Sequence, residues 1–97
     1  MIAKAQKKYL RTLAHERNTI LWIGQNGLTD NVLTEINIAL DHHELVKIKI
    51  RSADREDRDR LIGIICEKTD ADLIQKTGNV ILLYRINRNK PVISFPE

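Results

Sequence analysis

Residues 19–30 constrain the fold of this chain more than any other stretch of the sequence. A short apolar run over 20–23 contains β-branched residues and one aromatic residue and ends at a glycine, which is typical of a buried strand. Gly24 and Gly27 then frame a short loop, and Thr29 is a good N-cap for a helix that follows. The stretch therefore predicts a strand, a tight Gly-x-x-Gly loop and the start of a helix.

Such a loop is a candidate phosphate site. Glycines at both ends let a ligand backbone come close, and the helix start offers free N–H groups at the positive end of the helix dipole. The same pattern also occurs as a purely structural turn, so the loop alone leaves both interpretations open. The sequence excludes a Walker loop, because no Gly-Lys-Ser/Thr follows, and a dinucleotide fingerprint, because the third glycine is missing.

Length and composition indicate one soluble globular domain over residues 1–97. The chain is 42% apolar and 30% charged, which is ordinary for such a domain. One Trp, two Tyr and one Phe predict a core of Ile, Leu and Val, and argue against an RRM-like platform of stacked bases. The single cysteine excludes an internal disulfide, and no segment resembles a signal peptide or a membrane span, so we expect a cytoplasmic protein.

The positive charge lies in the first half of the chain. Residues 1–51 hold eight Lys or Arg and five Asp or Glu, whereas residues 52–97 hold eight of each, which together give the net charge of +3. Four cations share one face of a predicted helix with no acid before Glu16: Lys4, Lys7, Lys8 and Arg11. Such a patch favours a polyanionic partner, although a solvated helix face has the same pattern.

Hydrophobic periodicity predicts three helices and four strands. The helices are expected over 2–17, 30–40 and 55–69, and the strands over 20–23, 45–51, 72–77 and 80–85, with a hairpin turn at 78–79. This α-β-α-β-α-β-β order predicts an α/β two-layer sandwich, a four-stranded mixed sheet with the helices on one face. The first three strands should be parallel and the last antiparallel, with the strand 80–85, which is apolar up to residue 84, in the middle of the sheet. The tail 87–97 is expected to be extended.

The strand predicted over 45–51 alternates between apolar and basic residues. Val46, Ile48 and Ile50 should face the core, which leaves three cations on the other face: Lys47, Lys49 and Arg51. We therefore expect an open, basic sheet face. These cations either keep the protein soluble or extend a phosphate-binding surface.

Two adjacent histidines raise the possibility of an enzyme or a metal site. His42 and His43 could act with Asp41 or Glu44 in a small hydrolase, but neighbouring helical positions point in different directions and no third ligand lies at a recognised spacing. No nucleophile with a paired base is visible. We therefore predict a helix-end role for the histidines and a protein without catalytic residues, metal or cofactor. DNA binding is a further alternative, but no recognition helix is evident.

Four segments stand out when they are taken together in this order: residues 23–29, 43–49, 54–56 and 82–85. Together they resemble a known family, the chloroplast RNA splicing and ribosome maturation (CRM) domain, and in particular the stand-alone bacterial YhbY-like proteins. The resemblance extends from Lys4 to Arg85. It implies a fold like the C-terminal domain of bacterial translation initiation factor 3. It also implies RNA binding and association with precursors of the large ribosomal subunit. Trp22 departs from the family pattern, which usually has an aliphatic residue there.

Together these observations predict an RNA-binding surface and a partner. The partner is expected to be ribosomal RNA or a pre-ribosomal particle, bound by a monomer and without a membrane. Asn26 and Gln25 could bond sugar or base edges. The complete predicted surface comprises Gly24, Gln25, Asn26, Gly27, Thr29, Lys4, Lys7, Lys8, Arg11, Lys47, Lys49 and Arg51.

Overall fold

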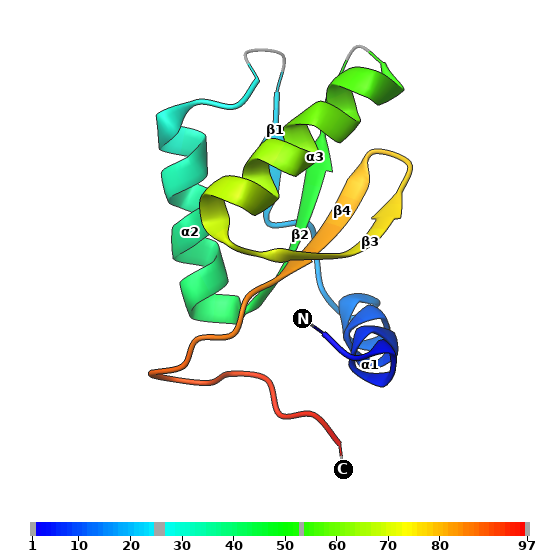
Figure 1. The fold of residues 1–97 in the computed structure, drawn as a ribbon, viewed down its shortest axis with the longest axis vertical. Coiled ribbons are helices and arrows are strands. Elements are labelled where there is room, and N and C mark those ends of the chain that lie inside the picture. Colours follow the sequence, from blue (N-terminus) through cyan, green and yellow to red (C-terminus); the bar gives the residue numbers. More distant parts are fainter. Residues whose placement is uncertain (1, 25–26, 53, 97) are drawn as a thin grey trace.

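The computed structural model describes residues 2–24, 27–52 and 54–96, and it confirms the predicted order of elements (Figure 1). Three helices alternate with strands before a final hairpin. In chain order the elements are α1 (Lys4–Ala14), β1 (Leu21–Ile23), α2 (Asp30–His43), β2 (Leu45–Ile50), α3 (Arg55–Thr69), β3 (Asp72–Thr77) and β4 (Val80–Tyr84).

The strands form one mixed sheet in the order β1-β2-β4-β3. β1 and β2 are parallel, and β4 is antiparallel to both of its neighbours, so the first three strands share one direction as predicted. From Ile81 to Tyr84 every residue of β4 is buried. A strand that is apolar on both faces needs neighbours and cover on both sides, which explains its place between β2 and β3.

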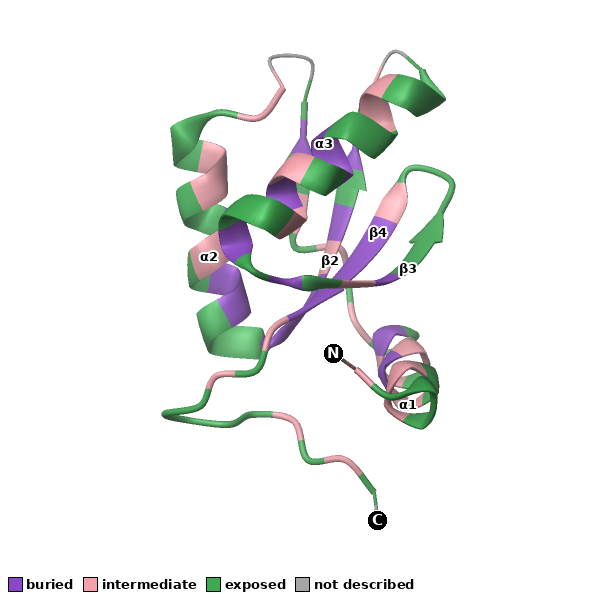
Figure 2. Ribbon diagram, viewed as in Figure 1, coloured by how far each residue is buried: buried purple, intermediate pink, exposed green. Residues whose placement is uncertain are grey.

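The larger hydrophobic core lies between the sheet and the helices α2 and α3 (Figure 2). Ile48 and Ile50 of β2 contribute to it, as does Ile23 at the end of β1. The two helices add their buried stripes, which include Ile36 of α2 and Ile65 of α3. This core fixes where β1 ends and α2 begins, and so it positions the Gly-x-x-Gly loop.

The prediction of a two-layer sandwich with all helices on one face is wrong for α1. A second apolar cluster joins Leu10 and Ala14 of α1 to Leu45, Leu82 and Tyr84, which belong to the opposite face of the sheet. These strand residues alternate with those that face the larger core, because successive side chains of a strand point to opposite faces. Leaving that second apolar face in water would be unfavourable. The sheet therefore lies between α1 on one side and α2 with α3 on the other.

α2 extends three residues beyond the predicted end and includes both histidines. It stops at Glu44, which has a φ of 61° and whose N–H donates to the Leu40 carbonyl at 2.9 Å. This residue is fully buried, at 0% exposure. A glutamate that is both buried and in the left-handed φ range must be held by specific partners.

The chain after β4 supplies those partners. The Glu44 carboxylate accepts three backbone N–H groups, from Asn87 at 2.7 Å, Val92 at 2.8 Å and Ile93 at 2.6 Å. Phe95 then packs against the rings of Tyr9 and Tyr84, with centroids 5.7 and 5.8 Å away. Within the described part of the chain, the tail forms no strand of the sheet. It is an extended segment that packs against the second apolar cluster and covers it.

Candidate nucleic-acid interface

The Gly-x-x-Gly loop connects the carboxyl end of β1 to the amino end of α2. The Gly27 N–H donates to the Gly24 carbonyl at 3.0 Å, and Gly27 has a φ of 75°, an angle that favours glycine. The Thr29 side chain accepts the Val32 N–H at 3.2 Å, which confirms Thr29 as the N-cap. The predicted contacts of Gln25 and Asn26 lie outside the described residues.

Both glycines are open to solvent on the side where a side chain would be. Among the described atoms beyond their chain neighbours, none lies within 4 Å of the position that a Cβ would take at Gly24 or Gly27. A ligand backbone can therefore approach the loop closely. The start of α2 adds N–H groups that have no partner inside the helix, apart from the one that Thr29 caps.

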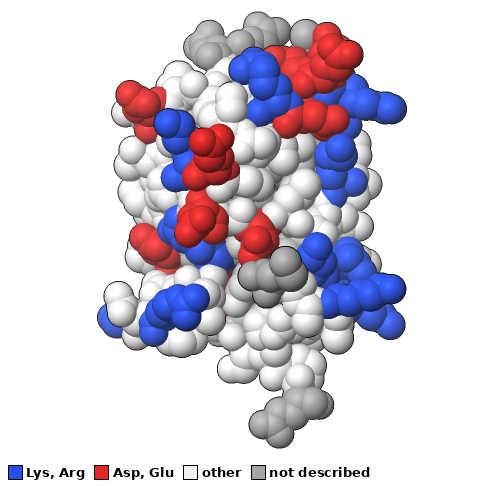
Figure 3. Space-filling model, viewed as in Figure 1, with Lys and Arg blue, Asp and Glu red and all other residues white. Residues whose placement is uncertain are grey.

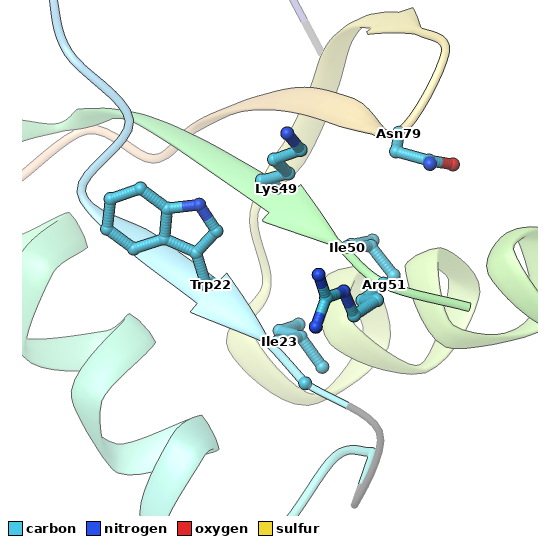
Figure 4. A pocket seen from close by; sticks show the side chains of 7 residues that line it. Trp22, Ile23, Lys49, Ile50, Arg51 and Asn79 are labelled. Carbon is cyan, nitrogen blue, oxygen red and sulfur yellow. The ribbon is translucent and has the colours of Figure 1, made fainter.

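Two of the three sheet cations lie beside this loop. Arg51 follows β2, and its N–H donates to the Ile23 carbonyl at 2.8 Å, while Lys49 pairs in register with Trp22. Both cations are exposed. They line an open hollow together with Gly24 and residues of β1, as the close view in Figure 4 shows. Positive charge and accessible backbone thus meet at one corner of the sheet.

Lys47, the third predicted sheet cation, is placed differently. It is half-buried, and its Nζ donates to the Arg17 carbonyl at 3.0 Å, which ties β2 to the segment after α1. The predicted open face is therefore only partly open. α1 covers one end of this face, and Lys49 with Trp22 remains exposed at the other end.

The predicted basic face of α1 lies away from the loop. Lys4 and Lys8 are exposed, whereas Lys7 and Arg11 are half-buried. Figure 3 shows Lys and Arg gathered at the lower right, where Figure 1 draws α1, whereas the start of α2 is drawn at the upper left. α1 packs near Leu45 at the start of β2, and the loop follows the end of β1, which pairs with the end of β2. The structure therefore gives two cationic regions at opposite ends of the sheet.

Three residues have structural or surface roles that the sequence patterns did not predict. Glu44 anchors the tail, and Trp22 is exposed although its strand was expected to be covered on both faces. The Arg85 guanidinium donates to Asn37 Oδ1 at 2.7 Å, to the Thr69 carbonyl at 2.7 Å and to Asp41 Oδ1 at 2.8 Å. Arg85 thereby joins α2 to the end of α3. The one hint in the sequence was that Arg85, a charged residue, directly follows the apolar run of a buried strand.

The histidines lie at the end of α2, and the cysteine packs against the larger core. His42 and His43 are exposed in the last turn of α2. Among the described residues no three His, Cys, Asp or Glu side chains are arranged to hold a metal ion. Burial raises the pKa of the Cys66 thiol, and the Asp72 carboxylate adds to the effect, so the thiol stays protonated at neutral pH. In the part of the chain that the structure describes, no helix has the length and apolar character needed to cross a membrane.

The fold and its surface define a small α/β domain with an open glycine loop at a helix start and cationic regions on exposed surfaces. Residues 2–85 match the family model of the CRS1/YhbY (CRM) domain. The chain therefore belongs to the CRM-domain family, which confirms the resemblance seen in the sequence.

Relatives of similar size support this assignment. A Haemophilus influenzae protein named "RNA-binding protein" is 44% identical over 84 residues, 87% of this chain and 85% of that protein. A Bacillus subtilis relative named "probable RNA-binding protein YqeI" is 30% identical over 96 residues, 99% of this chain and all of that protein. The solution structure of a Staphylococcus aureus protein superposes with a TM-score of 0.81 at 32% identity, covering 99% of this chain and 100% of that chain. These relatives are named as binding proteins and not as enzymes.

Proposed function

We propose that this protein is a non-catalytic, monomeric RNA-binding protein that holds RNA phosphates on the loop from Gly24 to Gly27. The observation that carries the proposal is the open space at Gly24 and Gly27, before the start of α2, beside the exposed cations Lys49 and Arg51. Backbone N–H groups at a helix start bind anions, and nearby cations add a charge attraction that any phosphate backbone can satisfy. The names of the relatives support RNA as the polyanion.

The finer role that we propose is binding of ribosomal RNA during assembly of the large ribosomal subunit. The family membership supports it, because the resemblance to stand-alone bacterial members implies association with precursors of that subunit. The same resemblance implies the fold of the C-terminal domain of translation initiation factor 3, which stays a prediction. Crosslinking in cells followed by sequencing of the bound RNA tests this role. Enrichment of large-subunit precursor RNA is expected, and its absence from the bound pool would contradict it.

The phosphate-binding role of the loop is tested by placing a carboxylate at Gly24, its first residue. Gly24 has an ordinary φ and open space at its Cβ position, so Gly24→Asp should fold normally. The new carboxylate would repel a phosphate, and we expect weaker RNA binding in an electrophoretic or anisotropy titration. We also expect the slope of log affinity against log salt to fall by about 0.7 for each lost phosphate contact on a single strand.

Gly24→Asn is the matched control, because it has the same shape without the charge. Its RNA affinity should stay close to that of the unmodified protein, with equal melting temperatures for both variants. Equal RNA affinity in Gly24→Asp and Gly24→Asn would assign the glycines to the turn alone. A competition between RNA and DNA of the same sequence completes the test, with RNA expected to bind more tightly.

A further inference from the structure

Trp22 is the most exposed of the large apolar side chains that the structure describes, at 66% exposure. Its neighbours Leu21 and Ile23 turn toward the larger core, so the strand alternation directs Trp22 to the opposite face of the sheet. β1 is an edge strand, and α1 covers only the far end of that face. The indole therefore lies on an open sheet surface, where burial within the domain does not explain it.

The surroundings of the indole are cationic and polar. Trp22 pairs in register with Lys49, and Figure 4 shows both side chains rising from the same side of β1 and β2. The hollow beside them has a volume of about 530 Å³ and is also lined by Arg51 and Asn79. None of the described residues that line it is acidic. An apolar protein partner would meet two charges here, whereas a nucleotide presents a flat base beside a negative phosphate.

We propose that Trp22 is a stacking platform for an unpaired nucleobase of the bound RNA, with Lys49 and Arg51 holding the adjoining phosphates. This inference rests on the proposed RNA-binding function and names the part of the RNA that binds beside the loop. An indole face stacks on any base, and cations beside it track the backbone. Asn79 also lines the hollow and adds a polar group there.

The position of Gly24 connects this platform to the loop. Gly24 follows Ile23 directly and lines the same hollow as Trp22. An RNA chain with a phosphate bound at the loop therefore places a neighbouring unpaired base on the indole. A base inside a duplex is stacked on its neighbours and cannot lie flat on the ring, so the platform selects single-stranded segments.

The chain offers a direct probe, because Trp22 is its only tryptophan. We would titrate the whole protein with a blunt hairpin RNA and with the same hairpin carrying a single-stranded oligouridylate tail, following tryptophan fluorescence and the anisotropy of a dye on the RNA. The tailed RNA should quench the fluorescence much more strongly than the blunt RNA. Trp22→Leu should weaken binding of the tailed RNA by roughly five- to a hundredfold, while Trp22→Phe should retain most of the affinity.

Blunt-hairpin affinity is the internal control and should be the same in Trp22→Leu and the unmodified protein. Tailed RNA that binds without quenching, or with equal affinity in Trp22→Leu, would overturn the platform while leaving RNA binding intact. Failure of the unmodified protein to bind either RNA would overturn the proposed function and this inference with it. If Trp22→Leu instead abolished self-association in sedimentation without altering RNA affinity, the patch would be a protein contact and the inference would be wrong.

Discussion

Single residues in unusual backbone or burial states set the shape of this domain. Gly27 has a φ of 75° in the loop, and Glu44 has a φ of 61° where α2 turns into β2. The first residue has no side chain to strain, whereas the second is held by three N–H groups of the tail. Each can therefore be tested by one substitution with a matched control.

Gly27→Ala should destabilise the fold, because an alanine at this positive φ brings its Cβ too close to the backbone. We expect a loss of about 1 kcal/mol in the free energy of unfolding, measured by urea titration. Gly24→Ala is the control, since Gly24 has an ordinary φ and open space, and its stability should change little. Equal stability in the two alanine variants would show that the loop relaxes to accept a side chain at 27.

Glu44→Gln should release the tail while the rest of the domain stays folded. The amide has one acceptor oxygen in place of two and directs N–H groups at N–H donors, so we expect a loss of about 2 kcal/mol in the free energy of unfolding. Both side chains have the same strain at positive φ, so this contribution cancels. Limited proteolysis should cut the segment after Arg85 faster than in the unmodified protein. Glu35→Gln on the exposed side of α2 is the control, and equal cleavage rates would show that the carboxylate does not hold the tail.

At the scale of elements, the two faces of α1 differ in role: one packs against the sheet, and the other presents positive charge. Its apolar face covers the second core, and its cations face outward or lie half-buried along their stems. Lys and Arg commonly bury their aliphatic stems while the charged ends stay in water. The charge of α1 can therefore be removed with little effect on packing.

Replacing Lys7, Lys8 and Arg11 with Gln should leave the melting temperature nearly unchanged. If all three contact phosphates, the salt-dependence slope of RNA binding should fall by about 2 on the scale of 0.7 per contact. The control replaces Arg55, Lys68 and Arg88, three exposed cations elsewhere, so that the net charge changes equally. Equal slopes in the two triple variants would mean that α1 contributes only general charge and makes no phosphate contacts.

At the scale of the whole molecule, the sheet separates a large core from a small one that α1 and the tail close. Tyr84 lies in the small core, and its burial, together with the nearby Glu44 and Asp72 carboxylates, raises the pKa of its phenol above the ordinary 10.0. Above that pH the unfolded chain loses the tyrosine proton while the folded state retains it. The fold therefore loses stability as pH rises from 10.0 through the raised pKa.

Tyr84→Phe should flatten this alkaline loss, because the ring remains and the ionisable hydroxyl is gone. The measurement is the free energy of unfolding by urea at a series of pH values on both sides of 10.0. Tyr9→Phe is the control and should leave the decline in place. A decline that is equally steep in Tyr84→Phe would assign the alkaline sensitivity to other groups.

Local patterns in the sequence were sufficient for the elements and their directions. The period of apolar residues located all three helices, and the continuously apolar run 80–84 correctly indicated a central strand. Thr29 was identifiable as an N-cap because capping depends on neighbours a few residues away. The family segments were also readable, since they are carried by residue identity and spacing.

Local patterns could not predict contacts between residues that are far apart in the sequence. Amphipathicity shows that α1 buries one face, but not which side of the sheet receives it, and the second apolar face on Leu82 and Tyr84 decided that. No local pattern around Glu44 shows that the tail, more than forty residues later, donates three N–H groups to its carboxylate.

The sequence by itself determined the order of elements, the directions of the strands, the helix start after the glycine loop and the family. These depend on backbone preferences and on burial within short segments, which neighbouring residues specify. Only the tertiary structure decided that the sheet has helices on both faces, that Lys47 is tied to a backbone carbonyl, and that Trp22 lies open beside Lys49 and Arg51. Each of these depends on which surfaces remain uncovered after the chain has packed, and that is a property of the whole fold.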